Sequence, residues 1–154
     1  MTAIADQPLP RPTDRRPTWD IIIDYVDELR GADADAELGV RAHVVPLVLV
    51  DMRERDAVGR ERYGTPLTSG NGRDHLVDAF QELLDGCVYL ASELDEHGVG
   101  VATVLSAEVF PDAAHRWYLR DVQQLCVSQI RAAIQLRAVI DERARRTSAV
   151  EDAP

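Results

Sequence analysis

The stretch 71-NGRDHLVDAFQELLDGCVYL-90 decides the fold that this sequence predicts. The pair Asn71-Gly72 favours a tight turn, and the Asp74 side chain can accept hydrogen bonds from the first N–H groups of a following helix. No proline then interrupts the chain before Glu96, which leaves room for several helical turns. Apolar residues recur at helical spacing and form one seam: Leu76, Phe80, Leu83, Cys87, Leu90 and Leu94. We therefore predict a long amphipathic helix that ends near Glu96.

Three carboxylates follow a line on the opposite side of this predicted helix. Asp78, Glu82 and Asp85 are spaced at i, i+4 and i+7, and Tyr89 continues the same line. Carboxylates stacked in this way repel one another by roughly 0.2–0.5 kcal/mol per pair, and a bound cation would relieve the repulsion. The alternative is a solvated face, which charged lines on amphipathic helices usually form. The spacing alone fits both interpretations.

The composition indicates a helical protein that repels nucleic acid. Apolar residues make up 45% of the 154 positions and aromatic residues only 5%, which suits one helix-rich domain with a packed core. The formal net charge is −10, so a nucleic-acid backbone would be repelled unless a local basic patch intervened. Polyphosphate substrates remain compatible with this charge when divalent metals neutralise both sides. We therefore expect no nucleic-acid partner.

The sequence shows no sign of export or membrane insertion. Its N-terminus is polar and proline-rich, and no apolar run approaches the length that spans a membrane. Cys87 and Cys126 each lie among apolar residues of predicted helices, which favours small core residues over a disulfide or a metal pair. We expect a protein of the reducing cytoplasm that does not contact a membrane.

The N-terminal half divides into a tail, a short helix, a linker and a long helix. Four prolines among polar residues predict a disordered tail over 1–17. Thr18 can cap a short helix over 19–30, in which Ile22 and Tyr25 would face inward. After an acidic linker over 31–39, a second long helix is predicted from about Val44 to Tyr63, with a proline in its first turn, where proline is tolerated.

An acid stands where the apolar seam of this second helix continues. Val45, Leu49 and Met52 lead at helical spacing to Asp56. A carboxylate on a buried seam is costly unless it is paired or bound to a metal. Arg60, one turn later, could supply the pair, and a metal ion is the other explanation. The ion pair with Arg60 and the metal ion both stay open as explanations of Asp56.

The C-terminal half is predicted to end in one more long helix. Residues 99–110 fit an extended piece, a helix extension or a packed loop. The last helix begins at Pro111, frays over 143–146 and leaves a disordered tail over 147–154; its seam is Leu119, Val122, Cys126, Ala133, Leu136 and Ile140. These elements predict an all-α, antiparallel bundle of three to five helices in a single domain over 18–146. The wide seams favour a homodimer or a higher homo-oligomer.

Several segments together resemble the MazG-like all-α nucleoside triphosphate pyrophosphohydrolases, in particular small phage and actinobacterial members. The segment 81-QELLDGCVYL-90 is similar to the E-L-x-D-x-x-x-Y-L helix of that family. Further similar segments are Arg55-Asp56, Gly59, 62-RYGTPL-67 and 71-NGRD-74, so the resemblance covers about Pro46 to Leu94. In the family, an E-E-x-x-E helix packs against this helix, and the acids of both hold magnesium on the triphosphate. That second motif is absent here, and its nearest substitutes are Asp51-x-x-Glu54 and Asp56.

The resemblance implies a catalytic role for Glu82 and Asp85. It also implies that Mg²⁺, or Mn²⁺, is held by five carboxylates: Glu54, Asp56, Asp78, Glu82 and Asp85. Oxygen ligands without His or Cys suit these ions better than zinc. Contacts to a nucleoside triphosphate would come from Arg60, Arg62, Tyr63, Asn71, Arg73 and Tyr89. Water would attack the α-phosphorus and release the monophosphate and pyrophosphate.

A second hypothesis belongs to a different class of protein. The chain could be a non-catalytic helical interaction or adaptor protein whose acidic lines only keep it soluble. The missing E-E-x-x-E motif favours this hypothesis. Asp56 on an apolar seam and Tyr89 on an acidic line favour the enzyme.

Overall fold

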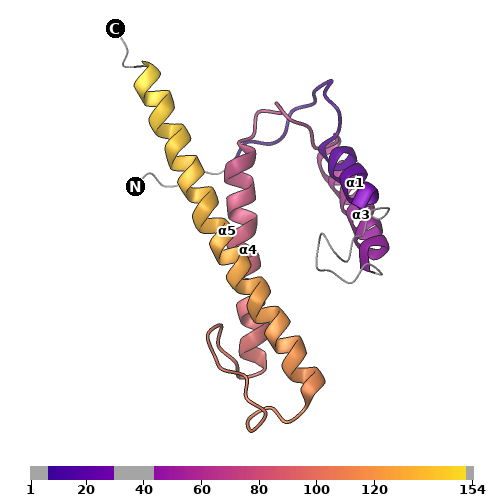
Figure 1. The fold of residues 1–154 in the computed structure, drawn as a ribbon. Helices are drawn as coiled ribbons and strands as arrows, with labels where there is room; N and C mark the ends of the chain where they lie inside the picture. The colour runs from indigo at the N-terminus through magenta and orange to yellow at the C-terminus, as the bar shows by residue number, and fades with distance from the viewer. Residues whose placement is uncertain (1–6, 30–43, 152–154) are drawn as a thin grey trace. The chain divides into compact units, whose positions relative to one another are not determined.

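The computed structural model describes residues 7–29 and 44–151, and the part of the chain so described is helical with connecting loops (Figure 1). The helices are α1 (Thr18–Leu29), α3 (Val45–Tyr63), α4 (His75–Glu96) and α5 (Ala113–Glu151). Between residues 7 and 151, outside the gap at 30–43, extended pairing is limited to one isolated bridge, Pro17 with Thr68. The predicted all-α fold is therefore confirmed, while the acidic linker predicted at 31–39 lies outside the described residues.

The chain divides into two compact units, and each is described here by itself. One unit is Met1–Asp74, which contains α1 and α3, and the other is His75–Pro154, which contains α4 and α5. We call them the α1–α3 unit and the α4–α5 hairpin. The single domain over 18–146 stays a prediction. No helix within the described ranges is long and apolar enough to cross a membrane.

The α4–α5 hairpin is antiparallel, as the residues in contact along it show. Glu93 of α4 meets Tyr118 near the start of α5, and the carbonyl oxygen of Cys87 meets the Cys126 thiol further along. A buried apolar cluster lies at the connected end and consists of Leu94, Val99, Leu119 and Val122. Residues 99–110, ambiguous in the sequence, form a packed loop, because Val101, Leu105 and Phe110 rest against that cluster.

The buried seam of α5 follows a seven-residue repeat. Leu119, Cys126, Ala133 and Ile140 are all buried, as the sequence predicted. This is the spacing at which one stripe of a helix stays in contact with a neighbouring helix. The small side chains in the middle of the stripe let the two helices approach closely, and the helix pair leaves both cysteines as free thiols.

The last helix runs five residues past Arg146, where we predicted that it would already have frayed into a tail. Ion pairs at helical spacing support this extension, because Glu142 binds both Arg145 at 3.0 Å and Arg146 at 2.8 Å. The Thr147 and Ser148 hydroxyls also donate to carbonyl oxygens four residues back. The helix described ends at Glu151.

The α1–α3 unit is a second antiparallel pair, with a thin core. Asp20 in the first turn of α1 lies beside Arg60 in the last turn of α3. Of the predicted seam of α3, Val45 and Leu49 are buried. Ile22 and Tyr25 of α1, which we expected to face inward, are exposed, so that expectation was wrong for this unit taken alone. Helix α3 ends at Gly64, whose φ of +67° is the left-handed conformation that suits glycine.

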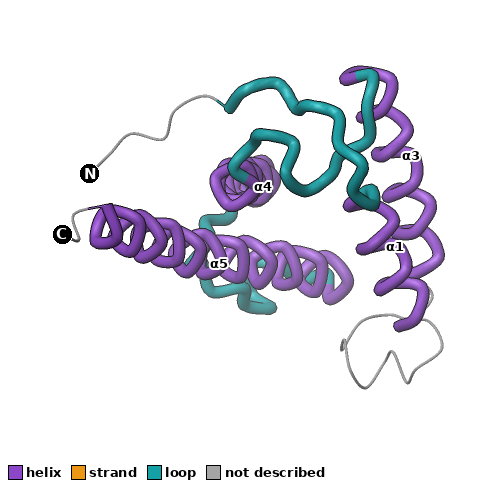
Figure 2. Tube along the Cα trace, turned by 90° about the horizontal axis from the view of Figure 1, so that it is seen from above, coloured by secondary structure: helices purple, strands orange, loops and turns teal. Residues whose placement is uncertain are grey.

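Residues 7–17, which we predicted to be part of a disordered tail, pack against the loop between α3 and α4. We call residues 7–17 the strap and residues 68–73 the glycine loop; both are teal tubes in Figure 2. Pro17 bridges to Thr68, and the Arg11 N–H donates to the Asn71 carbonyl at 2.8 Å. The prediction failed because a segment without a hydrophobic core can still be held by backbone hydrogen bonds.

Candidate functional site

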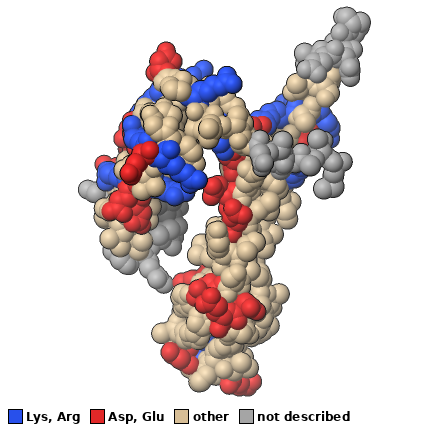
Figure 3. Space-filling view, turned by 180° about the vertical axis from the view of Figure 1, so that it is seen from behind, with Lys and Arg blue, Asp and Glu red and all other residues tan. Residues whose placement is uncertain are grey.

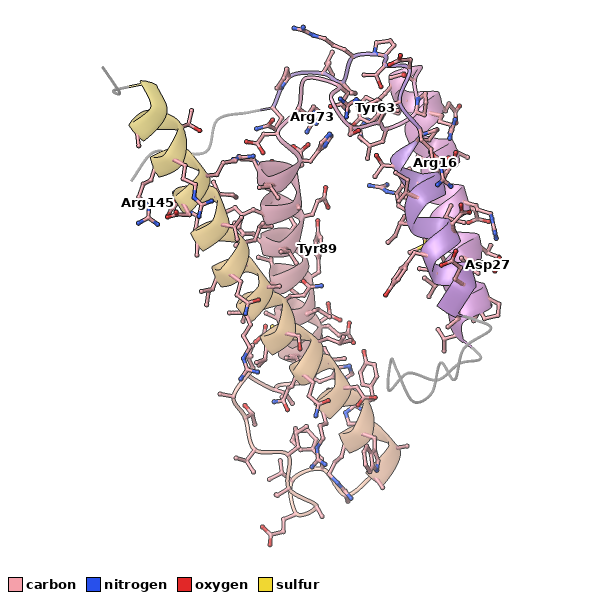
Figure 4. All side chains as sticks on the ribbon, turned by 45° about the horizontal axis from the view of Figure 1, so that its top comes forward. Arg16, Asp27, Tyr63, Arg73, Tyr89 and Arg145 are labelled. Carbon is pink, nitrogen blue, oxygen red and sulfur yellow. The ribbon has the colours of Figure 1, made fainter. Side chains whose placement is uncertain are left out.

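The acidic line predicted on α4 is present, and its members differ in their surroundings. Asp78 is half-buried, and its carboxylate lies 4.0 Å from His75 Nδ1. Glu82 and Asp85 are exposed, and neither forms an ion pair or a hydrogen bond with any described side chain. Tyr89 is 72% exposed and stands out from α4 (Figure 4). Two adjacent carboxylates without a cation are therefore open to a ligand from solvent.

The packing of α4 fixes the direction of this line. Gly86, the residue after Asp85, lies against the Gln129 side chain of α5. The line runs beside that contact on the helix surface, since Glu82 is four residues before Gly86 and Tyr89 three residues after it. Leu94 and Val77 are buried on other faces of α4. The carboxylates are thus held on a rigid helix with their oxygens in water.

Asp56 forms an ion pair with Arg60, which was one of the two explanations for an acid on the apolar seam of α3. Its carboxylate oxygen accepts a hydrogen bond from Arg60 Nε at 2.7 Å, and its side chain is only 15% exposed. Arg60 also lies 3.9 Å from Asp20 of α1. This arrangement satisfies the half-buried carboxylate without a metal. The role of Asp56 as a metal ligand stays a prediction, and so does the role of Arg60 toward substrate.

The other predicted residues of the α1–α3 unit are spread over its surface and its loop. Glu54 is exposed on α3. The Arg62 guanidinium lies 5.3 Å from the centre of the Tyr63 ring, a cation–π contact. Asn71 is fully buried, and its side-chain oxygen accepts the Arg73 N–H at 3.1 Å. Only the Asn71–Arg73 pair is brought together in a way that could serve one ligand.

The predicted metal site draws its ligands from both units. Glu54 and Asp56 belong to the α1–α3 unit, whereas Asp78, Glu82 and Asp85 belong to the α4–α5 hairpin. Within residues 7–29 and 44–151, no group of three or more His, Cys, Asp or Glu side chains is gathered closely enough to hold a metal ion. The convergence of these five carboxylates stays a prediction.

Sequence reasoning missed a polar cluster at the connected end of the hairpin. The Tyr118 hydroxyl donates a short hydrogen bond to Glu93, and His97 Nε2 lies 3.2 Å from the same carboxylate. The His115 ring packs edge-on to His97, with centroids 4.9 Å apart. The hydrogen bond from Tyr118 lowers the pKa of Glu93, and the bond to Glu93 in turn raises the pKa of Tyr118. Glu93 and Tyr118 are 25 positions apart, so no local spacing could have revealed their contact.

Comparisons with known proteins do not identify a relative. No protein-family model matches this chain, and no curated protein or solved structure is significantly similar to it. The resemblance to MazG-like hydrolases therefore stays a prediction that rests on the residues quoted above.

Proposed function

We propose that this protein is a Mg²⁺-dependent nucleoside triphosphate pyrophosphohydrolase that works in the reducing cytoplasm. The observation that carries the proposal is the pair Glu82 and Asp85, two exposed carboxylates one turn apart on α4 without a cationic partner in the described residues. Glu93 and Glu142, two carboxylates of intermediate burial on the hairpin, do have partners. The segment around the pair is also the one that resembles the family's E-x-x-D helix.

The residue types fit the ion that the resemblance implies. Carboxylate oxygens are the ligands that Mg²⁺ prefers, and a helix holds Glu82 and Asp85 at the separation of neighbouring turns. Bound Mg²⁺ would neutralise phosphate oxygens and lower the pKa of a coordinated water. Glu82 or Asp85 would accept the proton of that water. The oxygen of that water would then bond to the α-phosphorus while the bond from the α-phosphorus to the oxygen that bridges to the β-phosphorus breaks. The products would be a nucleoside monophosphate and pyrophosphate.

The substrate would be held by groups that do not take part in the cleavage. Arg73 and Arg62 supply guanidinium groups, which bind phosphate oxygens through paired, charge-assisted hydrogen bonds. Tyr89 stands exposed on the acidic line, where its ring could stack on a nucleobase. Asp56 and Glu54 would complete the metal ligands.

Exposed apolar side chains support the proposal that a second copy completes the bundle. On the hairpin, Leu84 and Val88 of α4 and Ile130 and Ile134 of α5 are all exposed. We call these four residues the hairpin patch. Several large apolar side chains left exposed on one helix pair are typical of an interface. In a symmetric dimer, the hairpin patch of one copy would pack against the hairpin patch of the other, so that both are buried in one contact.

The same exposed surface also favours the second candidate function, a non-catalytic interaction protein. Asp56 is satisfied by Arg60, and the family's E-E-x-x-E motif is missing, so the carboxylates of α4 could be a solvated face. This hypothesis predicts binding through the apolar surface and no turnover of nucleotides.

Pyrophosphate release from a panel of ribo- and deoxynucleoside triphosphates with Mg²⁺ separates the two functions. We expect turnover by the native chain, loss of at least a hundredfold in Glu82→Gln and Asp85→Asn, and no loss in the matched control Asp95→Asn. Asp95 is an exposed acid of the same helix that lies outside the line of Asp78, Glu82 and Asp85. A panel without turnover at any Mg²⁺ or Mn²⁺ concentration would reject the hydrolase and leave the interaction protein.

A further inference from the structure

We propose that the strap and the glycine loop form a binding site for the phosphate groups of a small polyphosphate. Its cationic side chains are Arg11 and Arg15 from the strap and Arg73 from the end of the loop. Neither strap arginine was a candidate in the sequence, because residues 1–17 had been predicted to be a disordered tail. All parts of the site belong to the α1–α3 unit.

The strap is held on the loop by hydrogen bonds along its whole length. The Thr13 hydroxyl donates to the Thr68 hydroxyl at 2.7 Å, and the Asp74 N–H donates to the Gln7 side-chain oxygen at 2.9 Å. Arg73 reaches back across the strap and donates from Nη1 to the Pro8 carbonyl at 2.8 Å. Together with the Arg11–Asn71 bond described above, these contacts fix the backbone on which the arginines stand.

Both strap arginines lie directly over glycines. Arg15 Nη1 donates to the Ser69 hydroxyl at 3.3 Å, and its Nε lies 3.4 Å from the position that a Cβ would take at Gly70. The Arg11 Cδ lies 3.7 Å from the corresponding position at Gly72. Gly70 and Gly72 both have positive φ, +73° and +88°. The loop therefore needs glycine for its turn, and it presents a bare backbone on which the two guanidinium groups can lie.

The positive charge of these two arginines is not neutralised. Neither Arg11 nor Arg15 forms an ion pair with an acid of the described chain, whereas the neighbouring Arg16 and Arg60 are paired with Asp24 and Asp56. Residues 7–19 and 60–73 together contain six arginines and two acids in a chain of net charge −10. Figure 3 shows basic side chains, with acidic ones among them, on the face of the α1–α3 unit that it draws. A concentration of one charge in a protein of the opposite charge marks a site for a counter-ion.

A buried donor without an acceptor lies in the same loop. Asn71 is fully buried, yet its side-chain nitrogen has no hydrogen-bond acceptor among the described residues. An unsatisfied buried donor costs roughly 1–3 kcal/mol, and native proteins rarely keep one without a use. A phosphate oxygen at the loop, directly or through one water, would supply the acceptor.

The choice of side chain indicates the chemistry of the ligand. All 17 basic residues of this protein are arginines, and arginine binds phosphate through two parallel N–H donors. The overall negative charge disfavours a long nucleic acid, so the ligand is a small molecule with two or three linked phosphates. Its use for the triphosphate of a substrate rests on the proposed function, whereas the binding of phosphate does not.

Titration calorimetry with inorganic triphosphate and pyrophosphate tests the site in EDTA, where no metal bound to α4 can contribute. We expect saturable 1:1 binding to the full chain that is weakened about tenfold in each of Arg11→Gln and Arg15→Gln and further in the double variant. The matched control is Arg16→Gln, which removes the same charge from the strap at a residue already paired with Asp24. Its affinity should stay within about twofold of the native value.

Amide hydrogen exchange provides a second measurement for any variant with altered folding. Triphosphate should slow exchange at the amides of Arg11 and of residues 69–73 in the native chain. The proposal is overturned if triphosphate fails to bind, if Arg16→Gln weakens binding as much as Arg15→Gln, or if a single-stranded oligonucleotide competes better than triphosphate. Because these measurements use no Mg²⁺ and no turnover, phosphate binding can survive the failure of the hydrolase, and the reverse also holds.

Discussion

Gly86 of α4 leaves the space that the Gln129 side chain of α5 occupies at the middle of the hairpin: a Cβ at Gly86 would lie 2.2 Å from Gln129 Oε1. That oxygen is buried and has no hydrogen-bond donor within the described chain. The two helices thus approach each other through a glycine on one side and an amide on the other. Such a contact makes the two positions depend on each other.

Gly86→Ala should therefore give different results in two backgrounds. Alanine in a helix interior is favoured over glycine by about 1 kcal/mol, but in the native background the Gln129 amide must move away, which offsets the gain. In a Gln129→Ala background the gain should appear in full. Urea unfolding of the four proteins measures the coupling, expected at about 0.5–1 kcal/mol.

Gly59→Ala in α3 is the control for this cycle, because a Cβ there would meet nothing within 4 Å. It should stabilise the protein by about 1 kcal/mol irrespective of residue 129. Equal effects of Gly86→Ala in both backgrounds would show that the contact has no energetic consequence.

The ion pair between Asp56 and Arg60 should contribute a measurable coupling free energy, because the Asp56 side chain is half-buried. We expect a coupling free energy of about 0.5–1 kcal/mol from the cycle Asp56→Asn, Arg60→Gln, at the upper end of the range for partly exposed pairs. Asp51→Asn, an exposed acid of the same helix, should change stability by less than about 0.5 kcal/mol. A coupling indistinguishable from zero would instead favour the metal explanation of Asp56.

Divalent metals should raise the melting temperature of the native chain. A ligand that binds only the folded state stabilises it by RT ln(1 + [L]/Kd), which is about 1.4 kcal/mol at ten times Kd. The shift with Mg²⁺ or Mn²⁺ should disappear in the double variant Glu82→Gln, Asp85→Asn and persist in Asp95→Asn. An identical shift in all three proteins would place the metal elsewhere.

Acid should weaken the native protein more than the variant Tyr118→Phe. The Tyr118 hydrogen bond lowers the pKa of Glu93 below 4.5, so the stability that this pair provides is present at neutral pH and is lost as the pH falls through the lowered pKa. Without the hydroxyl the pKa of Glu93 moves back toward 4.5. Unfolding free energies between pH 7 and pH 3 should therefore converge for the two proteins, and an NMR titration of Glu93 reports its pKa directly.

The hairpin patch should control self-association. Ile134→Glu and Val88→Glu place a charge where an apolar side chain would be buried, so they should convert a dimer into a monomer in light scattering. Gln124→Glu, an exposed polar position on α5, should leave the dimer intact. A native chain that is monomeric at all concentrations would remove self-association from the proposal.

Helical periodicity predicted the parts of the fold that local sequence controls. The ends of α3 and α4 were predicted because Gly64 and Gly98 follow them, and both glycines adopt positive φ, as does Gly72 before the start of α4. The buried seam of α5 followed from its spacing. The packed loop over 99–110 could not be chosen from sequence, because its order depends on distant residues such as Leu119 and Val122.

The candidate site was predictable only in its separate pieces. The line Asp78, Glu82 and Asp85 follows from helix geometry, and pairing with Arg60, one turn later, was one of the two explanations left open for Asp56. The strap arginines escaped notice because their contacts with Ser69 and Asn71 span more than fifty residues. Periodicity contains no information about contacts of that range.

The contacts of the strap have a practical consequence for anyone who shortens this protein. Removal of residues 1–17 would delete a proline-rich segment that the sequence alone gives no reason to keep. It would, however, remove the Thr13 hydroxyl, which donates to the Thr68 hydroxyl, and the Arg11 N–H, which donates to the Asn71 carbonyl. Expression of the trimmed form is therefore a poor starting point for crystallisation or ligand screening.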